Sequence, residues 1–415
     1  MHPLRTLAFV LATAAGLVRA EDGFTSMFNG SDLTGWRGKE GYWSVQDGVI
    51  RGDTTKKPLG KNTFLIWDGG KPANFELKLS FRLQNGNAGV QYRSEELDDF
   101  VVKGYQAEVE NTPGKVGFLY DEKGRGWMVN VGDIMEVSPT GEKKVVGKVS
   151  DVEELKKTGY YREKDWNDYH IICRGPHVLH YLNGHPTVEL IDLDEKGRHL
   201  SGVIALQIHS GPGMVVEYKD PRIKMLPGTY GAPRRLFNGT DLAGWTVPFD
   251  NVKEANTFTV KDGVLHNSGK PAGYIRTTDD FGSYVLRLQI RHLTEGNSGV
   301  LLRMVGNDKV WPKSIECQGQ FRAKGDIWNI DNFPMKTDPA RTNGRHTVKL
   351  HPDNEKPLGG WNDYEMVLKG GDLEIYVNRL LQNTATECDA TPGKICFQSE
   401  GSEVEFRNIV LIPVE

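Results

Sequence analysis

The sequence predicts an all-β protein made of two tandem antiparallel β-sandwiches of the jelly-roll kind. Apolar and polar residues alternate with period two, as in FELKLSFRL at residues 75–83 and YVLRLQIR at residues 284–291. Turn signals such as Asn183-Gly184 separate these runs. Only VEELKKT, residues 152–158, is expected to be helical. The third observation is an internal repeat.

A unit that occurs twice in the chain predicts the division into domains. FNGSDLTGW at residues 28–36 returns as FNGTDLAGW at residues 237–245, and WNDYHIICRG at residues 166–175 returns as WNDYEMVLKG at residues 361–370. A segment rich in proline and glycine, residues 227–233, lies between the copies. We expect a first domain over residues 21–228, a linker over residues 229–233 and a second, divergent domain over residues 234–415.

The composition is that of a globular protein without a basic surface. The 415 residues are 38% hydrophobic and 26% charged, with a formal net charge of −4. This length fits two domains of ordinary size. Proteins that bind nucleic acid or an anionic membrane surface need an excess of positive charge, which this chain lacks. We therefore expect no nucleic-acid partner.

The first twenty residues have the pattern of a secretory signal. Arg5 precedes an apolar, alanine-rich stretch, residues 7–18, and Val18-Arg19-Ala20 ends in a small residue before Glu21. The apolar stretch is shorter than the roughly 20 residues that a membrane span requires, which argues against an anchor. No later segment has the character of a span. We expect cleavage near Ala20 and a secreted or periplasmic protein.

The four cysteines say little about function. Cys388 and Cys396 flank a short segment that a disulfide could close, and export would permit such a bond. The spacing of Cys173, Cys317, Cys388 and Cys396 is unlike that of a zinc site. The sequence leaves open whether any of them is bonded.

The stretch NGNAGVQYRSEELDDFVVKGYQAEVEN, residues 85–111, predicts two strands with an apolar and a polar face. Val90 and Tyr92 alternate with Gln91 and Arg93, and the second run of this stretch alternates in the same way. GVIALQIH, residues 202–209, is a third such run. If the three strands share a sheet, its polar face carries Gln91, Arg93, Gln106, Glu108, Glu110, Gln207 and His209. We expect this face to line a concave binding surface.

These residue types suit chemistry on a sugar. Arg93 offers a planar set of donors for hydroxyl groups or a carbonyl oxygen. Glu108 and His209 are side chains that transfer protons near neutral pH, and they could instead be two ligands of a divalent metal. An exposed sheet face is often merely polar, so solvated side chains are the plain alternative.

The second copy keeps part of this polar set and exchanges the rest. Arg303 repeats Arg93, and Gln398 repeats Gln207. The exchanged positions are Gln91 to Leu301, Gln106 to Glu316, Glu108 to Gln318 and His209 to Glu400. Because a solvated face has no reason to keep a polar set, we expect Arg303, Glu316 and Gln318 to bind ligand as well. If one copy is catalytic, the combination of Glu108 with His209 marks it as the first.

A charged loop supplies further candidates. In YDEKGRGW, residues 120–127, a tryptophan follows Tyr120, Asp121, Glu122 and Arg125, a composition that fits the rim of a sugar site. DEKG is equally an ordinary charged turn. The loop is therefore a binding candidate with a structural alternative.

Several motifs together closely resemble the 3-keto-disaccharide hydrolase-like domain family. They are LFNGxDLxGW, WSVxDGVI, GNAGVQYR, GYQAE, YDExGRG, WNDYHIICRG and GxIALQxHSG followed by VEY. The resemblance covers nearly the whole chain after the signal, twice over, and the second copy departs from it at the position of His209. It implies a concanavalin A-like jelly roll that acts on glycosides whose sugar carries a ketone at C3.

The chemistry that this resemblance implies gives the candidate residues roles. A ketone at C3 acidifies the proton on C2, so a base can start an elimination that expels the C1 substituent, and water addition completes net hydrolysis. Glu108 and His209 would transfer the protons or hold a metal, and Arg93 and Gln106 would bind the oxyanion or hydroxyl groups. The partner would be an oligosaccharide or glycoside, and a divalent metal is the one cofactor that these residues suggest.

Two other functions stay open. Tandem jelly rolls of exported proteins also bind glycans without cleaving them, and linked copies gain avidity. An ordinary retaining glycosidase needs two carboxylates about 5 Å apart. The first copy offers Glu108 and Glu110 for that role, two residues apart on one strand.

Overall fold

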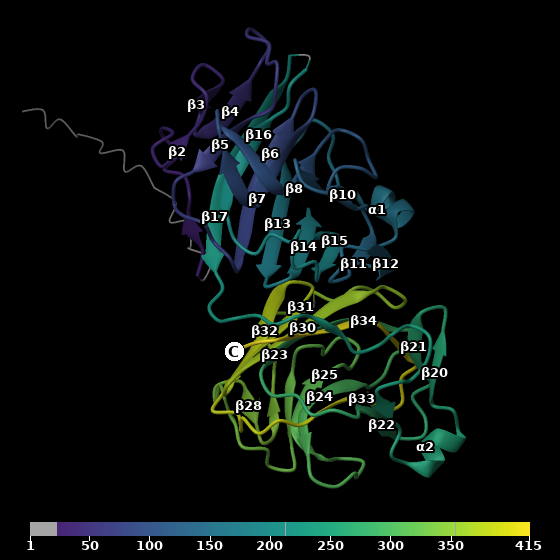
Figure 1. The fold of residues 1–415 in the computed structure, drawn as a ribbon. Coiled ribbons are helices and arrows are strands. Elements are labelled where there is room, and N and C mark those ends of the chain that lie inside the picture. Colours follow the sequence, from purple (N-terminus) through teal and green to yellow (C-terminus); the bar gives the residue numbers. More distant parts are fainter. Residues whose placement is uncertain (1–22, 212, 353) are drawn as a thin grey trace, which may run out of the picture.

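The computed structural model describes residues 23–211, 213–352 and 354–415. The predicted signal peptide, residues 1–20, lies outside the described residues. Figure 1 shows the first half of the chain, purple to teal, as one β-rich body above a second body that runs from green to yellow. Each body is built from two extended β-sheets, so the predicted all-β fold of two tandem sandwiches is confirmed.

The first domain contains a ten-stranded and a seven-stranded sheet. In spatial order the ten-stranded sheet consists of β12 (Lys143–Lys148), β11 (Asp133–Val137), β15 (His185–Asp192), β14 (His177–Leu182), β13 (Asn167–Arg174), β6 (Phe75–Leu83), β17 (Val215–Met225), β4 (Val49–Asp53) and β3 (Trp43–Gln46), with β1 (Thr25–Ser26) beside β17. The seven-stranded sheet consists of β10 (Gly126–Val129), β9 (Leu119–Glu122), β8 (Val101–Val109), β7 (Ala88–Leu97), β16 (Val203–Ile208), β5 (Thr63–Trp67) and β2 (Trp36–Arg37).

The second domain repeats this arrangement with a nine-stranded and an eight-stranded sheet. The nine-stranded sheet consists of β20 (Phe258–Lys261), β21 (Val264–Asn267), β34 (Val404–Pro413), β23 (Tyr284–His292), β30 (Asn362–Lys369), β31 (Asp372–Val377), β32 (Leu380–Thr386) and β27 (Lys336–Thr337), with β18 (Arg234–Arg235) beside β34. The eight-stranded sheet consists of β19 (Trp245–Thr246), β22 (Gly273–Thr277), β33 (Lys394–Ser399), β24 (Gly299–Val305), β25 (Lys313–Gln318), β26 (Ile327–Ile330), β29 (His346–Thr347) and β28 (Thr342–Asn343).

Among the described residues, two short helices interrupt the strands. The predicted helix is α1 (Val152–Thr158), in which the Asp151 side chain accepts a hydrogen bond from the amide of Glu154 and Gly159 ends the helix in the left-handed region. The other helix, α2 (Asp250–Glu254), was not predicted. A helix of one turn with a single buried apolar residue has no periodicity that a sequence pattern could reveal.

The core of the first domain lies between its two sheets, where the alternating residues meet. Phe75, Leu77, Phe81 and the other apolar residues of β6 are buried against Val90 of β7 and its neighbours. The second domain has an equivalent core. The face of the seven-stranded sheet that is turned away from this core is the one on which the polar candidates were expected, and we call it the outer face.

The two domains pack on each other through buried ion pairs. Both terminal guanidinium nitrogens of Arg174 on β13 donate hydrogen bonds to the carboxylate of Glu365 on β30, at 3.0 and 2.9 Å. Arg287 of the second domain lies 3.1 Å from Glu189 of the first. The other members of the cluster are Arg379 and Glu76, so three arginines face three glutamates. Because the charges balance in a buried layer, these contacts fix how the domains are oriented.

The four cysteines, Cys173, Cys317, Cys388 and Cys396, are all buried and free. The bond between Cys388 and Cys396 that their spacing would allow is therefore absent from this structure. Within residues 23–211, 213–352 and 354–415, no helix has the length and apolarity to cross a bilayer.

Candidate functional site

The outer face of the seven-stranded sheet brings four of the predicted polar residues into one buried group. Gln91 and Gln106 are direct partners on β7 and β8, and the Gln91 amide donates to Oε1 of Gln106 at 2.7 Å. The Gln106 amide donates in turn to Glu108 at 2.8 Å. Gln207 of β16 lies on the same face, and all four side chains are at most 3% exposed. This row forms the floor of the candidate site.

A glycine lets this floor lie flat against the sheet. Gly89 pairs with Glu108 across the two strands. A β-carbon at Gly89 would lie 2.4 Å from Cδ of Gln106, which real atoms do not tolerate. The Gln106 side chain therefore occupies the space above Gly89, and its amide can reach the Glu108 carboxylate.

Glu108 is the most perturbed acid of the outer face. Burial raises the pKa of its carboxyl to about 7, although hydrogen bonds from Gln106 and Asn87 lower it. The charges of Glu110 and Glu122 raise it further. Sequence reasoning missed Asn87, whose side-chain amide donates to Glu108. The available signal was its place in GNAGV, which recurs as GNSGV in the second copy.

His209 and Glu122 complete the group from the two sides of the face. His209 follows β16, and its Nδ1 lies 2.6 Å from the carbonyl oxygen of Ser210. Burial raises the pKa of Glu122, and the charges of Lys123 and His209 and a hydrogen bond from Asn62 lower it. The charge of His209 therefore affects the pKa of Glu122, and the charge of Glu122 affects the pKa of Glu108. Glu122 thus interacts electrostatically with both members of the predicted pair, Glu108 and His209.

The site is buried because a bent hairpin covers one end of the outer face. The register of β7 against β8 shifts between Tyr92 and Glu95, and Gly104 opposite this bulge has φ +152°. The hairpin then folds back, so that the amide of Phe64 on β5 donates to the carbonyl of Phe100 at 2.9 Å. Its tip is held by Arg37, which makes two hydrogen bonds to Glu96 at 2.6 and 2.7 Å.

The expected position of Arg93 is wrong. The bulge places Arg93 at φ +48° and ends the alternation at this residue. Its guanidinium donates to the carbonyl oxygens of Ala73 at 2.8 Å, Gly175 at 2.6 Å and His199 at 3.3 Å. Arg93 is 1% exposed and ties the bend of β7 to three loops. It is not available to a substrate.

Arg303 has the same anchoring role in the second domain. It has φ +50° and donates to the carbonyls of Gly282 at 3.4 Å and Gly370 at 2.7 Å. These glycines stand where Ala73 and Gly175 stand in the first copy, as the matched sequences show. The arginine was kept in both copies because it anchors the bend, so the expected ligand-binding role of Arg303 fails for the same reason.

The charged loop divides between the two sides of the sheet. Tyr120 pairs with Gln106 and so lies on the outer face, as Glu122 does. Asp121 pairs with Tyr105 of the core side and accepts from Nε2 of His199 at 2.9 Å. Arg125 is likewise bound internally, and its partners are Asp121, Asp192 and Asp194. The expectation that Asp121 and Arg125 form a rim is therefore wrong, because strand alternation turns Asp121 inward.

An aromatic edge flanks the floor. Trp127 of β10 pairs with Tyr120, which pairs with Gln106. The Trp127 ring stacks on Phe118 with centroids 3.8 Å apart and an angle of 11°, yet Trp127 is 45% exposed. A half-exposed, rigid aromatic ring beside buried polar groups has the composition of a sugar-binding surface.

The second domain has an outer face of its own on the eight-stranded sheet. Glu316 and Gln318 of β25 pair with Leu301 and Gly299 of β24, in the same register as Gln106 and Glu108 against β7. Gln318 accepts from the amide of Gln320 at 3.0 Å. The polar pair is thus present in both domains, in opposite order.

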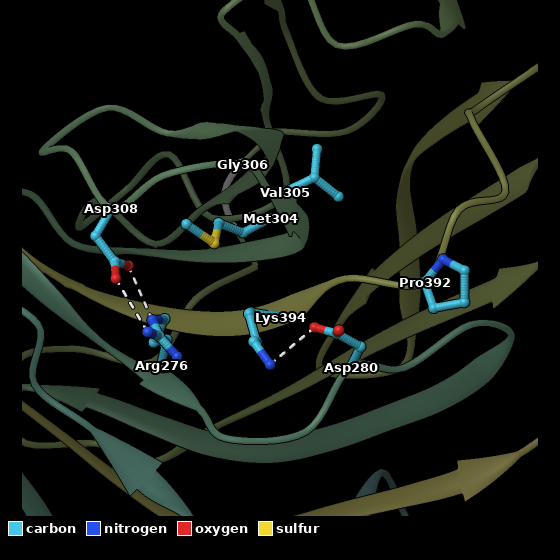
Figure 2. Close-up of a pocket in the computed structure, with 8 residues that line it drawn as sticks. All are labelled: Arg276, Asp280, Met304, Val305, Gly306, Asp308, Pro392 and Lys394. Carbon is cyan, nitrogen blue, oxygen red and sulfur yellow. Dashed lines mark hydrogen bonds and ion pairs between the residues drawn. The ribbon is translucent and has the colours of Figure 1, made fainter.

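A bent hairpin covers this second face too. Figure 2 shows Asp308, from the loop between β24 and β25, paired with Arg276 of β22, and Lys394 paired with Asp280. The cavity between these ion pairs measures about 210 Å³. The residues that line this cavity do not include Glu316 or Gln318, so it is separate from the polar pair of this domain.

Residues 23–211, 213–352 and 354–415 contain no group of three or more His, Cys, Asp and Glu that could hold a metal ion. Within these residues Glu108 and His209 belong to no such group.

Comparison with known proteins gives one strong match and several remote ones. The model of the 3-keto-alpha-glucoside-1,2-lyase-like domain matches residues 23–224 and again residues 232–412. No curated protein is significantly similar in sequence.

Three of the similar solved structures each align with less than half of the chain. A candidate glycosyl hydrolase from Parabacteroides distasonis is 20% identical and covers 44% of this chain and 94% of its own, with a TM-score of 0.35. A carbohydrate-binding module from Bacillus subtilis is 12% identical over 40% and 93%, with a TM-score of 0.29. A β-glucanase from Bacillus licheniformis is 14% identical over 38% and 83%, with a TM-score of 0.30. Through both matched regions, the chain belongs to the 3-keto-alpha-glucoside-1,2-lyase-like domain family.

Proposed function

We propose that the first domain cleaves glycosides whose sugar carries a ketone at C3. The observation that carries the proposal is Glu108, a buried carboxyl whose pKa lies near 7 and which hydrogen bonds from Gln106 and Asn87 hold in place. A general base works best when its pKa is near the working pH. Membership of the 3-keto-alpha-glucoside-1,2-lyase-like domain family supports this choice of substrate class.

The reaction would begin when the Glu108 carboxylate takes the proton from C2. The C–H electrons form a double bond between C1 and C2, the bond from C1 to the leaving oxygen breaks, and that oxygen takes a proton. Water then adds to C1, and C2 regains a proton, which gives the free 3-keto sugar. In this scheme His209 protonates the leaving oxygen, and Gln91 and Gln106 orient the base.

The group that steadies the developing enolate oxygen would be Gln207 in place of Arg93. Gln207 is fully buried, and neither its Nε2 nor its Oε1 has a hydrogen-bond partner. An unpaired buried amide is costly unless a ligand or water pairs with it. The amide N–H is a preorganised donor for negative charge on oxygen. The Trp127 surface would hold the sugar that leaves.

The test uses a 4-nitrophenyl glucoside that has been oxidised at C3, with the unoxidised glucoside as the control substrate. We expect nitrophenol release from the keto substrate only, at a rate above the blank without enzyme, slowed by deuterium at C2 and unchanged by a chelator. Glu108→Gln should lower kcat/KM by about 10³-fold, the scale of a lost general base. Glu153→Gln on the exposed surface of α1 is the matched control.

Two results would refute this assignment. Equal release from the oxidised and unoxidised glucosides would exclude elimination, and a Glu108→Gln variant with full activity would exclude the base. Export to the periplasm or the exterior is part of the same proposal, motivated by residues 1–20, and fractionation of cells that express the whole chain tests it.

A second candidate function is glycan binding without turnover, favoured by the aromatic pairs beside the polar floor in both domains. Substitution of Arg93 and Arg303 would not test it, since both arginines anchor the fold. Binding of unmodified disaccharides by a protein that never turns over the keto substrate would support it.

A further inference from the structure

In the polar pair of the second domain, the glutamate and the glutamine have exchanged places relative to the first domain. Gln106 and Glu108 of β8 correspond in register to Glu316 and Gln318 of β25. The carboxyl has therefore moved two positions along the strand, and an amide stands where the base stood. His209 is replaced by Glu400, so the neighbouring proton carrier has also changed.

The moved carboxyl lies beside a second buried amide, above a glycine. A β-carbon at Gly299 would lie 2.9 Å from Oε1 of Glu316 and 2.2 Å from Oε1 of Gln398. Gln398 is 1% exposed, and its amide interacts with the Glu316 carboxyl and lowers its pKa. The residue equivalent to Gln207 is thus again buried on the outer face, here next to a carboxyl.

The protonation state of Glu316 suits a hydrogen-bond donor. Burial and the charge of Glu400 raise the pKa of Glu316 to about 8, while a hydrogen bond from Gln398 and the charge of Arg345 lower it. Burial raises the pKa of Glu400 as well. A carboxyl with this raised pKa keeps its proton in a large share of the protein at neutral pH and can then donate a hydrogen bond. What separates this face from the first is its register, because the amide of Gln318 stands where the base Glu108 stands in the first domain.

An aromatic wall stands beside Glu316, as it does beside Gln106. Trp328 of β26 pairs in register with Glu316, and His346 of β29 pairs with Trp328. The two rings stack with centroids 4.3 Å apart at an angle of 9°. The exposed Arg345 lies over the indole, 5.2 Å from the ring centroid, and its charge is felt by both Glu316 and Glu400.

We propose that this face of the second domain is a separate carbohydrate site, which binds a neutral glycosyl unit and does not remove its C2 proton. The protonated Glu316 carboxyl can donate a hydrogen bond to one sugar hydroxyl. The Gln398 amide can donate to, or accept from, the adjacent hydroxyl. Trp328, His346 and Arg345 form the wall against which the sugar ring packs. The inference rests on the proposed function only for the ligand class, since the site itself is defined by its own residues.

The test measures disaccharide binding to the whole Glu108→Gln protein by isothermal titration calorimetry, with cellobiose, maltose and trehalose as probes. We expect Trp328→Ala to reduce the number of binding sites by one for at least one probe. Arg345→Ala, an exposed substitution that should leave the fold intact, should weaken this site about tenfold. Trp311→Ala removes another exposed tryptophan of the same domain and is the matched control.

A second measurement follows the affinity of this site with pH. Binding should be constant up to about pH 7 and weaken above pH 8 as Glu316 ionises, and Glu316→Gln should remove this dependence. A merely structural role for Glu316 would leave the same pH dependence in that variant, which would overturn the inference.

The outcomes separate the two proposals. An unchanged number of sites in the Trp328→Ala protein overturns the second site, whatever the first domain does. Turnover of the 3-keto substrate that persists in Glu108→Gln and is lost on Glu316→Gln would show a second catalytic centre and also overturns it. Loss of one site on Trp328→Ala, in a chain that never turns over the keto substrate, supports the second site and refutes only the lyase.

Discussion

The pH dependence of turnover tests the role of Glu108 most directly, and Glu122→Gln is the perturbation that isolates it. The pKa of Glu108 is about 7, raised by burial and by the charges of Glu110 and Glu122. A base must be ionised to act, so about one-tenth of the protein is competent at pH 6 and about nine-tenths at pH 8. We expect kcat/KM for the 3-keto substrate to rise about tenfold over this range.

Removal of the Glu122 charge takes away one of the two negative neighbours of Glu108. The pKa of Glu108 should fall, and the midpoint of the pH profile should move to lower pH. A midpoint one unit lower would raise the ionised fraction at pH 6 from about one-tenth to about one-half, and the ratio of rates at pH 8 and pH 6 would fall from about ten to about two. This ratio is the quantity to measure, because it is insensitive to a uniform loss of activity.

The control is Glu153→Gln, which removes a carboxylate from the exposed surface of α1 and should leave the ratio unchanged. Two results would refute the reasoning. A wild-type profile that is flat between pH 6 and pH 8 would mean that the essential base is not Glu108. A Glu122→Gln profile that coincides with the wild type would mean that the carboxylates of the outer face do not act on one another.

Three further predictions concern structure. Arg93→Met should lower the free energy of unfolding of the first domain, measured in urea, by about 3 kcal/mol or more, because three buried carbonyls lose their charged donor. A variant with wild-type stability and no turnover would contradict the anchoring role. Glu365→Gln should cost about 3–5 kcal/mol in the same assay, because three buried arginines would face two carboxylates, and a loss below about 1 kcal/mol would mean that the domain interface is hydrated. Thiol titration should find four free cysteines after denaturation in guanidinium and almost none before it, whereas two after denaturation would indicate a disulfide.

Strand alternation predicted the faces of the sheets well and failed where the strands bend. Gln91, Gln106, Glu108 and Gln207 lie together because their strands are regular up to the bulge. Arg93 is one position past the last regular pair, and a positive φ there leaves no mark in the hydrophobic pattern. The predicted outward position of Asp121 was wrong for a related reason. The sequence of a hairpin turn does not show at which residue the strand begins or ends, so the face of residues near the turn cannot be assigned. Asn87 was missed because a residue before a strand has no expected face.

The two copies also show how an internal duplication should be read. Both copies must fold, so a residue that both retain is first of all evidence about folding, and Arg93 and Arg303 prove to hold the same carbonyls at the same bend. Exchange in register is the more informative pattern, because Glu and Gln swap places on β8 and β25 without disturbing either sheet. Such a swap changes what the face can donate, accept or abstract while leaving the fold alone. The exception is Gln207 with Gln398, which both copies keep buried on the outer face. The Gln207 amide has no partner in the protein, and the Gln398 amide lies beside the Glu316 carboxyl. An anchoring residue would have found partners in the protein, so the unpaired Gln207 amide points to a ligand on the first face.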